Sequence, residues 1–231
     1  MSIHIQTSLL RVLLAAALVL GTAPSSNAAI IDWGGAAGHS ITGDSDVSTE
    51  GTLVFAVHFG ANGIGDTTVN GVTFTGVGAI IGGTSNSLGA ANLPFSSLSA
   101  PYQAMLSSGH VGGTTPFNFL FTMLTPGETY QFEWWSNNSS TGTMTNTVAV
   151  AGNSLPLSSN TAATVGGLGE FAVGTFVADG TQQAIYFAPP VFTGPFVTTV
   201  NAFQLRQVPE PGTGLLLTLG AGALLQRRRR G

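Results

Sequence analysis

Large apolar residues occupy every second position in several segments of this chain. Segments 52–59 and 117–123 show the pattern most clearly, with smaller or polar residues between the large ones. Because successive side chains of a β-strand point to opposite sides of the sheet, a period of two places the apolar set on one face. The residues predicted to point inward from these two strands are Leu53, Phe55, Val57, Phe59, Phe117, Phe119, Phe121 and Met123.

Five further segments have the composition of strands. They are rich in Val, Thr, Phe and Tyr and are bounded by Gly, Asn or Pro. They cover residues 130–134, 143–150, 170–177, 183–187 and 197–205. Pro126 and Gly127 predict a type II turn before the first of these, and Asp179-Gly180 favours a hairpin between strands 170–177 and 183–187.

One short helix is expected among the strands. Ser99 can cap it, Pro101 falls in its first turn, residues 102–107 fit its body and Gly109 closes it. About eight to ten strands with turns roughly every 8–15 residues and a single helix indicate an all-β fold. We predict an antiparallel β-sandwich of the jelly-roll type.

The N-terminus has the features of a secretory signal peptide. Arg11 precedes an apolar run at residues 12–20, and small residues follow at 26–29. A helix over that run would span about 14 Å, less than half of a hydrocarbon core of about 30 Å, which disfavours a membrane anchor. We therefore predict a signal helix at residues 1–28, removed by signal peptidase after Ala28.

The C-terminus carries a second targeting pattern. Pro209, Glu210 and Pro211 precede an apolar stretch at residues 214–225, and a basic cluster ends the chain. The prolines keep their segment extended and open to a protease, while the basic cluster stays on the cytoplasmic side of a membrane. A buried core helix is disfavoured because these four consecutive arginines would have to remain in water: Arg227, Arg228, Arg229 and Arg230.

This order of features resembles the PEP-CTERM sorting signal of Gram-negative bacteria. The resemblance implies that an exosortase-type processing enzyme recognises the tail at the inner membrane and removes it near the tripeptide. The apolar stretch is short for a permanent span, which suits a transient membrane anchor. We divide the chain into a signal peptide at 1–28, a β-sandwich domain at 29–207 and a sorting signal at 208–231. The mature protein is expected at the cell surface or in the extracellular matrix.

The predicted domain is acidic and contains no lysine or cysteine. Residues 29–207 hold nine Asp or Glu residues and a single arginine, Arg206. Nucleic-acid binding is excluded because it needs Lys and Arg to displace phosphate counterions. The absence of Cys and Lys excludes a disulfide scaffold, a thiolate metal site and Schiff-base chemistry.

Few residues in the predicted domain are candidates for catalysis. His58 is expected on the polar side of its strand, in solvent or in a local hydrogen bond, and His39 and His110 in loops. No G-x-S-x-G elbow nominates a serine nucleophile. We expect no catalytic residues and a protein that is not an enzyme.

Oxygen-bearing side chains alternate in segment 44–50. Its acids are Asp44, Asp46 and Glu50, and Ca²⁺ prefers such oxygen ligands. The segment lacks the central Gly and final Glu of an EF-hand loop, and the alternative is a turn in which Asp and Ser bond to their own backbone. A structural calcium is predicted here, and no other cofactor.

Two adjacent tryptophans offer a second candidate site, for carbohydrate. Trp134 and Trp135 follow Glu133, and an acid beside aromatic rings is typical of sugar sites. Adjacent strand residues face opposite ways, so at most one of the two indoles is expected at the surface. Packing at the edge of a sheet is the alternative explanation for Glu133.

Four segments of the body resemble segments recurring in PEP-CTERM exoproteins, a group similar in layout to galactose-binding-like and malectin-like sandwiches. They are residues 46–54, 69–74, 124–130 and 173–180. The resemblance implies a fold more than an activity. Our first hypothesis is an exported, non-enzymatic protein of the cell envelope or extracellular matrix with an interaction or structural role. The alternatives are a carbohydrate-binding module that takes an extracellular polysaccharide and, after it, a polysaccharide hydrolase.

Overall fold

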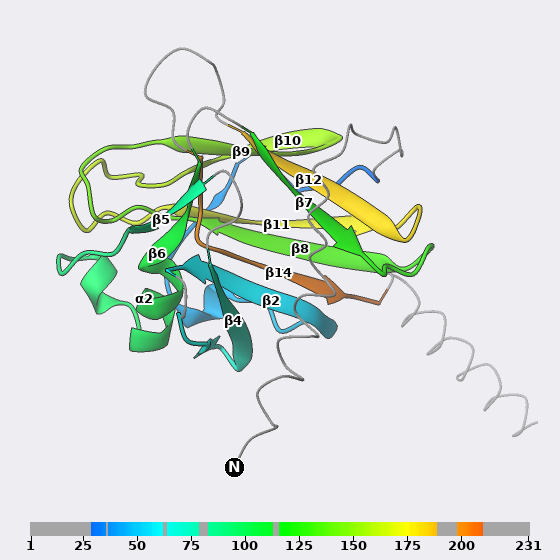
Figure 1. The fold of residues 1–231 in the computed structure, drawn as a ribbon, viewed down its shortest axis with the longest axis horizontal. Helices are drawn as coiled ribbons and strands as arrows, with labels where there is room; N and C mark the ends of the chain where they lie inside the picture. Colours follow the sequence, from blue (N-terminus) through cyan, green and yellow to red (C-terminus); the bar gives the residue numbers. More distant parts are fainter. Residues whose placement is uncertain are drawn as a thin grey trace, which may run out of the picture.

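Three β-sheets form a sandwich in the computed structural model of the chain (Figure 1). The structure describes residues 29–35, 37–61, 64–78, 83–112, 116–188 and 198–209. The predicted signal helix, the cleavage position Ala28 and the predicted sorting helix lie outside these residues. Within the described ranges, no helix is long and apolar enough to cross a membrane.

The larger layer is a sheet of seven strands, most of them antiparallel. β2 and β4 run parallel, which departs from the expected antiparallel arrangement. The reason is that the chain leaves β2, forms β3 at the sheet edge and turns back into β4, so β4 re-enters in the direction of β2. In spatial order the strands are β1 (His39–Ser40), β11 (Glu170–Val177), β8 (Thr129–Ser136), β14 (Ala202–Gln207), β2 (Thr52–Gly60), β4 (Val72–Gly78) and β3 (Thr67–Val69).

Two smaller antiparallel sheets complete the strand structure. The four-stranded sheet has the order β10 (Asn153–Ser158), β9 (Asn146–Ala151), β12 (Gln182–Ala188) and β7 (Phe117–Thr122). The three-stranded sheet has the order β13 (Thr198–Val200), β6 (Ser108–Gly112) and β5 (Gly83–Ser87). Two short 3-10 turns at Asp44–Asp46 and Phe95–Ser97 and one helix, α2 (Ala100–Leu106), connect the strands of the described body.

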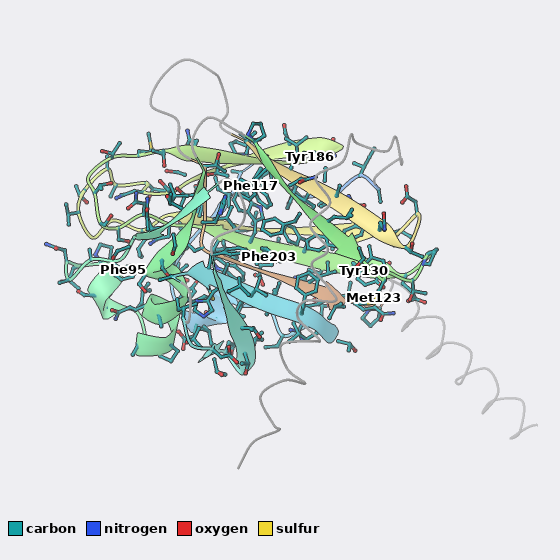
Figure 2. The ribbon with its side chains drawn as sticks, viewed as in Figure 1. Phe95, Phe117, Met123, Tyr130, Tyr186 and Phe203 are labelled. Atoms are coloured by element: carbon teal, nitrogen blue, oxygen red, sulfur yellow. The ribbon has the colours of Figure 1, made fainter. Side chains whose placement is uncertain are left out.

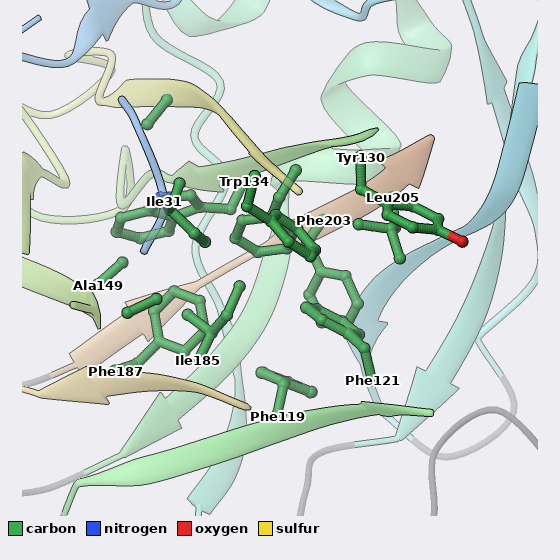
Figure 3. Close-up of a cluster of buried hydrophobic side chains, with 14 of the residues drawn as sticks. Ile31, Phe119, Phe121, Tyr130, Trp134, Ala149, Ile185, Phe187, Phe203 and Leu205 are labelled. Carbon is green, nitrogen blue, oxygen red and sulfur yellow. The ribbon is translucent and has the colours of Figure 1, made fainter. Parts of the chain in front are cut away.

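Aromatic side chains fill the space between the layers. Phe119 on β7 meets Phe203 on β14 with ring centroids 4.4 Å apart, and Trp134 on β8 meets Phe187 on β12 at 4.9 Å. Figure 3 shows these side chains converging from strands of both layers. Of the residues predicted to point inward, those of the strand interiors in β2 and β7 belong to this core or pack against it, so the period-2 pattern is confirmed there. Leu53 and Met123, at the ends of the pattern, were predicted to point inward but are exposed.

A second apolar cluster covers the opposite face of the seven-stranded sheet. Tyr102, Met105 and Leu106 from α2 pack there with Trp135 of β8 and Phe74 of β4, all buried. This cover leaves every residue of β8 buried, on both faces of the strand. A strand with alternating polar residues is thus enclosed on both sides, which its pattern alone did not indicate.

The predicted helix is confirmed. The hydroxyl of Ser99 accepts the backbone N–H of Tyr102 at 3.2 Å, and Pro101 lies in the first turn. Helix α2 ends at Leu106, with Ser107 as the C-cap, whereas Gly109 belongs to β6.

The two predicted turns have different outcomes. Gly127 has a φ of +85°, and the N–H of Glu128 donates to the carbonyl of Thr125 at 3.2 Å, as in the predicted type II turn. Asp179-Gly180 does connect β11 to β12, but those strands belong to different sheets, so the predicted hairpin is wrong. Each strand finds its hydrogen-bond partners elsewhere in its own layer.

Candidate functional site

The residues predicted to contact carbohydrate are buried in the middle of β8. Glu133 is 1% exposed, and Trp134 and Trp135 are 0% exposed. Trp134 packs into the core between the layers, while Trp135 stacks on Phe171 beneath the cover of α2. β8 lies between β11 and β14, so the alternative of a sheet edge is also wrong. The structure corrects this candidate site because both faces of the strand are covered.

A chain of hydrogen bonds joins Trp135 to the segment before β2. The indole N–H of Trp135 donates to the hydroxyl of Tyr102 at 3.0 Å, and that hydroxyl donates to Oδ2 of Asp46 at 3.0 Å. Asp46 also accepts the backbone N–H groups of Thr42 and Gly43. Burial, followed by the negative charge of Asp46, raises the pKa of Tyr102, so the phenol stays a neutral donor.

Glu133 lies next to this chain and is the most perturbed carboxyl group of the described body. Its Oε2 accepts the N–H of Ser48 at 3.2 Å and the amide N–H of Gln204. Its Oε1 has no hydrogen-bond partner among the described residues. Burial raises the pKa of Glu133 to about 7, and the hydrogen bonds from Gln204 and Ser48 limit the rise. Both protonation states are therefore populated near neutral pH.

Arg206 completes the cluster and holds the loop that precedes β2, at residues 49–51, on the sheet. Its Nε donates to the carbonyl of Glu50 at 2.6 Å, and Nη2 donates to the carbonyls of Thr49 and Gly51, both at 3.1 Å. Its Nη1 donates to Oε1 of Gln204 at 3.3 Å. Arg206 is only 6% exposed, and its guanidinium group binds three successive backbone carbonyls.

The acids predicted to bind calcium do not converge. Oδ1 of Asp44 accepts the hydroxyl of Ser99 at 2.5 Å, and the carboxylate of Asp46 is engaged by Tyr102 and the backbone. Glu50 is exposed. Across the described ranges, no group of three His, Asp or Glu side chains could hold a metal ion. Calcium binding stays a prediction, but these oxygen atoms already have protein donors.

The three histidines of the described residues are spread over the fold. His39 is exposed on the short strand β1 and not in the predicted loop, with its ring 5.3 Å from that of Phe171. His58 is buried, with Nε2 2.9 Å from the carbonyl of Gly65, so the local hydrogen bond is confirmed and the solvent-exposed position is wrong. His110 is buried on β6 rather than in a loop, and burial lowers the pKa of both buried imidazoles, that of His110 to about 4.

The folded body ends where the sorting pattern begins. Gln207 is the last residue of β14, and the N–H of Val208 donates to the carbonyl of Thr129 at 3.0 Å. Val208 is 7% exposed, whereas Pro209 is exposed. Gly51, with a φ of +71°, presses against the carbonyl of Gln207, where a Cβ would collide. The chain is therefore bound to the sheet as far as Val208. The remaining sorting residues lie outside the described part: Glu210, Pro211, Arg227, Arg228, Arg229 and Arg230.

Sequence reasoning missed the residues that build the buried cluster. Gln204 and Arg206 alternate with the core residues Phe203 and Leu205, which is the pattern of a solvent face. The one available signal was that Arg206 is the single arginine of an acidic body. The carboxyl group of this cluster is buried, and its hydrogen bonds join β8 to β14 and to the segment before β2.

Comparison with known proteins identifies the C-terminal segment. Residues 207–230 match the family described as the PEP-CTERM protein-sorting motif. No curated protein matches the chain. The motif shows an exported protein directed to the cell surface and implies processing by an exosortase-type enzyme.

Several solved structures resemble the folded body. They include the plant receptor-like kinase FER (15% identity, 68% of this chain and 42% of that chain, TM-score 0.49). The ANXUR1 extracellular domain from Arabidopsis thaliana matches at 13% identity, over 69% of this chain and 51% of that chain, with a TM-score of 0.47. A calcium-binding mutant of beta-glucuronidase 2 from Bacteroides uniformis matches at 13% identity, over 67% and 18%, with a TM-score of 0.46. The chain thus spans about half or less of the length of these proteins.

Proposed function

We propose that this is a non-enzymatic protein of the cell envelope or extracellular matrix that acts by binding or assembly after its tail is removed. The observation that carries the proposal is the junction at Val208. The sandwich holds the chain through its last strand and Val208, and the sorting tripeptide begins at the next residue, Pro209, which is exposed. A processing enzyme at the inner membrane would then remove the tail without disturbing the sheet.

The burial of the Glu133 carboxyl group supports a role other than catalysis. A glycosidase needs two carboxyl groups flanking a sugar bond. Glu133 is enclosed by Ser48 and Gln204, and Glu128 lies outside β8, where it accepts the amide of Gln207. These two acids therefore do not form a catalytic pair, and the hydrolase is the least supported alternative.

The first prediction concerns processing of the tail. In a Gram-negative host with an exosortase, we expect the mature chain to begin at Ala29 and to end at Val208 or later. Cleavage before Val208 would remove a buried residue and its hydrogen bond to Thr129. Mass spectrometry of the intact protein from the cell surface and the culture fluid measures both ends.

Two variants sharpen this test. Replacing Pro209, Glu210 and Pro211 with Ala is expected to leave a membrane-bound precursor that keeps its terminal arginines. Thr218→Ser preserves the tripeptide and the length of the apolar stretch, so it should be processed like the wild type. Recovery of a wild-type surface protein with Arg227 to Arg230 still attached would contradict the proposed sorting route.

A further inference from the structure

The outer side of the four-stranded sheet is uncharged. Residues of β12 alternate between the core, where Ile185 and Phe187 are 0% exposed, and the outer side, where Tyr186 is 39% exposed. Strands β7, β9, β10 and β12 contain no charged residue at all. Each acid of the body lies on another strand, in a 3-10 turn or in a loop, and Glu170 of β11 reaches this sheet only at its edge, where it accepts the backbone N–H of Ser158 at the end of β10. We call the outer side of this sheet the neutral face.

The strand register places a mixed row of side chains across the neutral face. Tyr186 pairs with Asn118 on β7 and with Val150 on β9, and Val150 pairs with Ser154 on β10. The row therefore presents an amide, a phenol ring, an apolar side chain and a hydroxyl side by side. Figure 2 labels Tyr186 on this layer of the molecule.

The surroundings of Tyr186 leave its ring available. Its neighbours on the same side of β12 are Ala184 and Ala188, two small residues. Among the described residues, the hydroxyl group of Tyr186 has no hydrogen-bond partner. Tyr102 and Tyr130, in contrast, are buried, and their hydroxyl groups are hydrogen-bonded.

We propose that the neutral face, centred on Tyr186, binds an uncharged polysaccharide; this rests on the proposed role of the protein as an exported binding protein. A sugar ring has an apolar face that stacks on a phenol ring and hydroxyl groups that pair with amide and hydroxyl side chains. The row of Asn118, Tyr186 and Ser154 offers both kinds of contact. An anionic polysaccharide finds no cation on this face and a surplus of acids on the rest of the body.

Two features favour a polysaccharide over a second copy of the chain. The core of a stable protein interface is apolar, but the neutral face exposes Gln182 and Ser154 beside Tyr186 and Pro156. The body also carries nine acids and one arginine, so two copies repel each other. In addition, β14, which leads to the sorting motif, belongs to the other layer of the sandwich.

The test is retention on insoluble polysaccharides. The full chain, purified in detergent from a host without an exosortase, is applied to cellulose, cross-linked dextran and agarose, with carboxymethyl cellulose as the anionic counterpart of cellulose. We expect retention on at least one neutral matrix, weaker retention on the anionic one, and a roughly 10-fold loss of affinity in Tyr186→Ala, the size of one aromatic contact. Met123→Ala, which truncates a 65% exposed apolar side chain in the turn after β7, should bind like the wild type.

Each contrary outcome would overturn the proposal. They are failure of the wild type to bind any neutral matrix, equal binding by Tyr186→Ala, and preference for carboxymethyl cellulose. A concentration-dependent dimer that Tyr186→Ala dissociates, without glycan binding, would show a self-association surface instead. Circular dichroism and the melting temperature confirm that both variants are folded. Because the assay uses unprocessed protein, a failure of sorting in cells does not affect its result.

Discussion

Replacing Arg206 with Ala is expected to lower the free energy of unfolding by about 3 kcal/mol. The change removes the guanidinium that binds the carbonyls of Thr49, Glu50 and Gly51, and it leaves Glu133 without its nearby positive charge. Leaving a buried polar group without its hydrogen-bond partner typically costs about 1–3 kcal/mol, and we take the upper end because three carbonyls lose their donor together. Urea unfolding followed by tryptophan fluorescence at pH 7 measures the difference, since the Trp side chains are buried.

Two neighbouring variants separate charge from geometry. Arg206→Lys keeps the positive charge but has no planar fork to reach three carbonyls, so it should recover about half of the loss. Gln207→Ala removes only an exposed hydrogen bond to Glu128 and should change stability by less than about 0.5 kcal/mol. If all three variants unfold at the same urea concentration as the wild type, Arg206 does not hold the loop.

Replacing Glu133 with Gln is expected to change how stability depends on pH. The pKa of Glu133 rises from 4.5 to about 7 on folding, chiefly through burial. Between these two values the folded protein binds a proton that the unfolded chain has released, so stability falls as pH rises and is constant above about pH 7. The full effect is up to about 3 kcal/mol. Glu133→Gln removes it, so the variant should gain stability relative to the wild type between pH 5 and pH 8.

The buried histidines act in the opposite direction and remain in both proteins. The pKa values of His58 and His110 are lowered by burial, so the folded protein loses stability as pH falls below the unfolded value of 6.5. Subtracting the wild-type curve from that of Glu133→Gln cancels this contribution. Denaturant unfolding at pH 5, 6, 7 and 8 gives the difference, and two parallel curves would show that Glu133 does not titrate in this range.

Local sequence patterns predicted those parts of the fold whose structure depends on residues close together in the sequence. Helix α2 starts at its Ser99 cap because the hydroxyl group satisfies a free N–H three residues later. The turn at Gly127 forms because only Gly readily adopts the required positive φ. Most of the large inward residues of β2 and β7 were predicted because an apolar face must meet an apolar partner, whichever strand supplies it.

Local sequence patterns did not predict which strands pair with each other. The Asp-Gly turn between β11 and β12 has the chemistry of a hairpin, yet it connects two layers, because both strands find longer pairings with β8 and β7. The predicted strand at 197–205 is split at Asn201 for the same reason: its halves pair with β6 and with β8. Pairing depends on contacts between residues far apart in the sequence, which a local pattern does not contain.

The sequence by itself indicated export to the cell surface, because the sorting motif at residues 207–230 is a linear pattern that is readable without the fold. The N-terminal signal peptide stays a prediction. The sequence also determined a β-sandwich with an aromatic core, through the period of its apolar residues. Only the tertiary structure decided which polar residues are enclosed and which are exposed. Helix α2 and the loop before β2 cover β8, so Glu133 and Trp135 become packing elements, while Tyr186, on the uncovered side of the other sheet, is left open to solvent. Exposure is set by what folds over a strand, and that is a property of the whole chain.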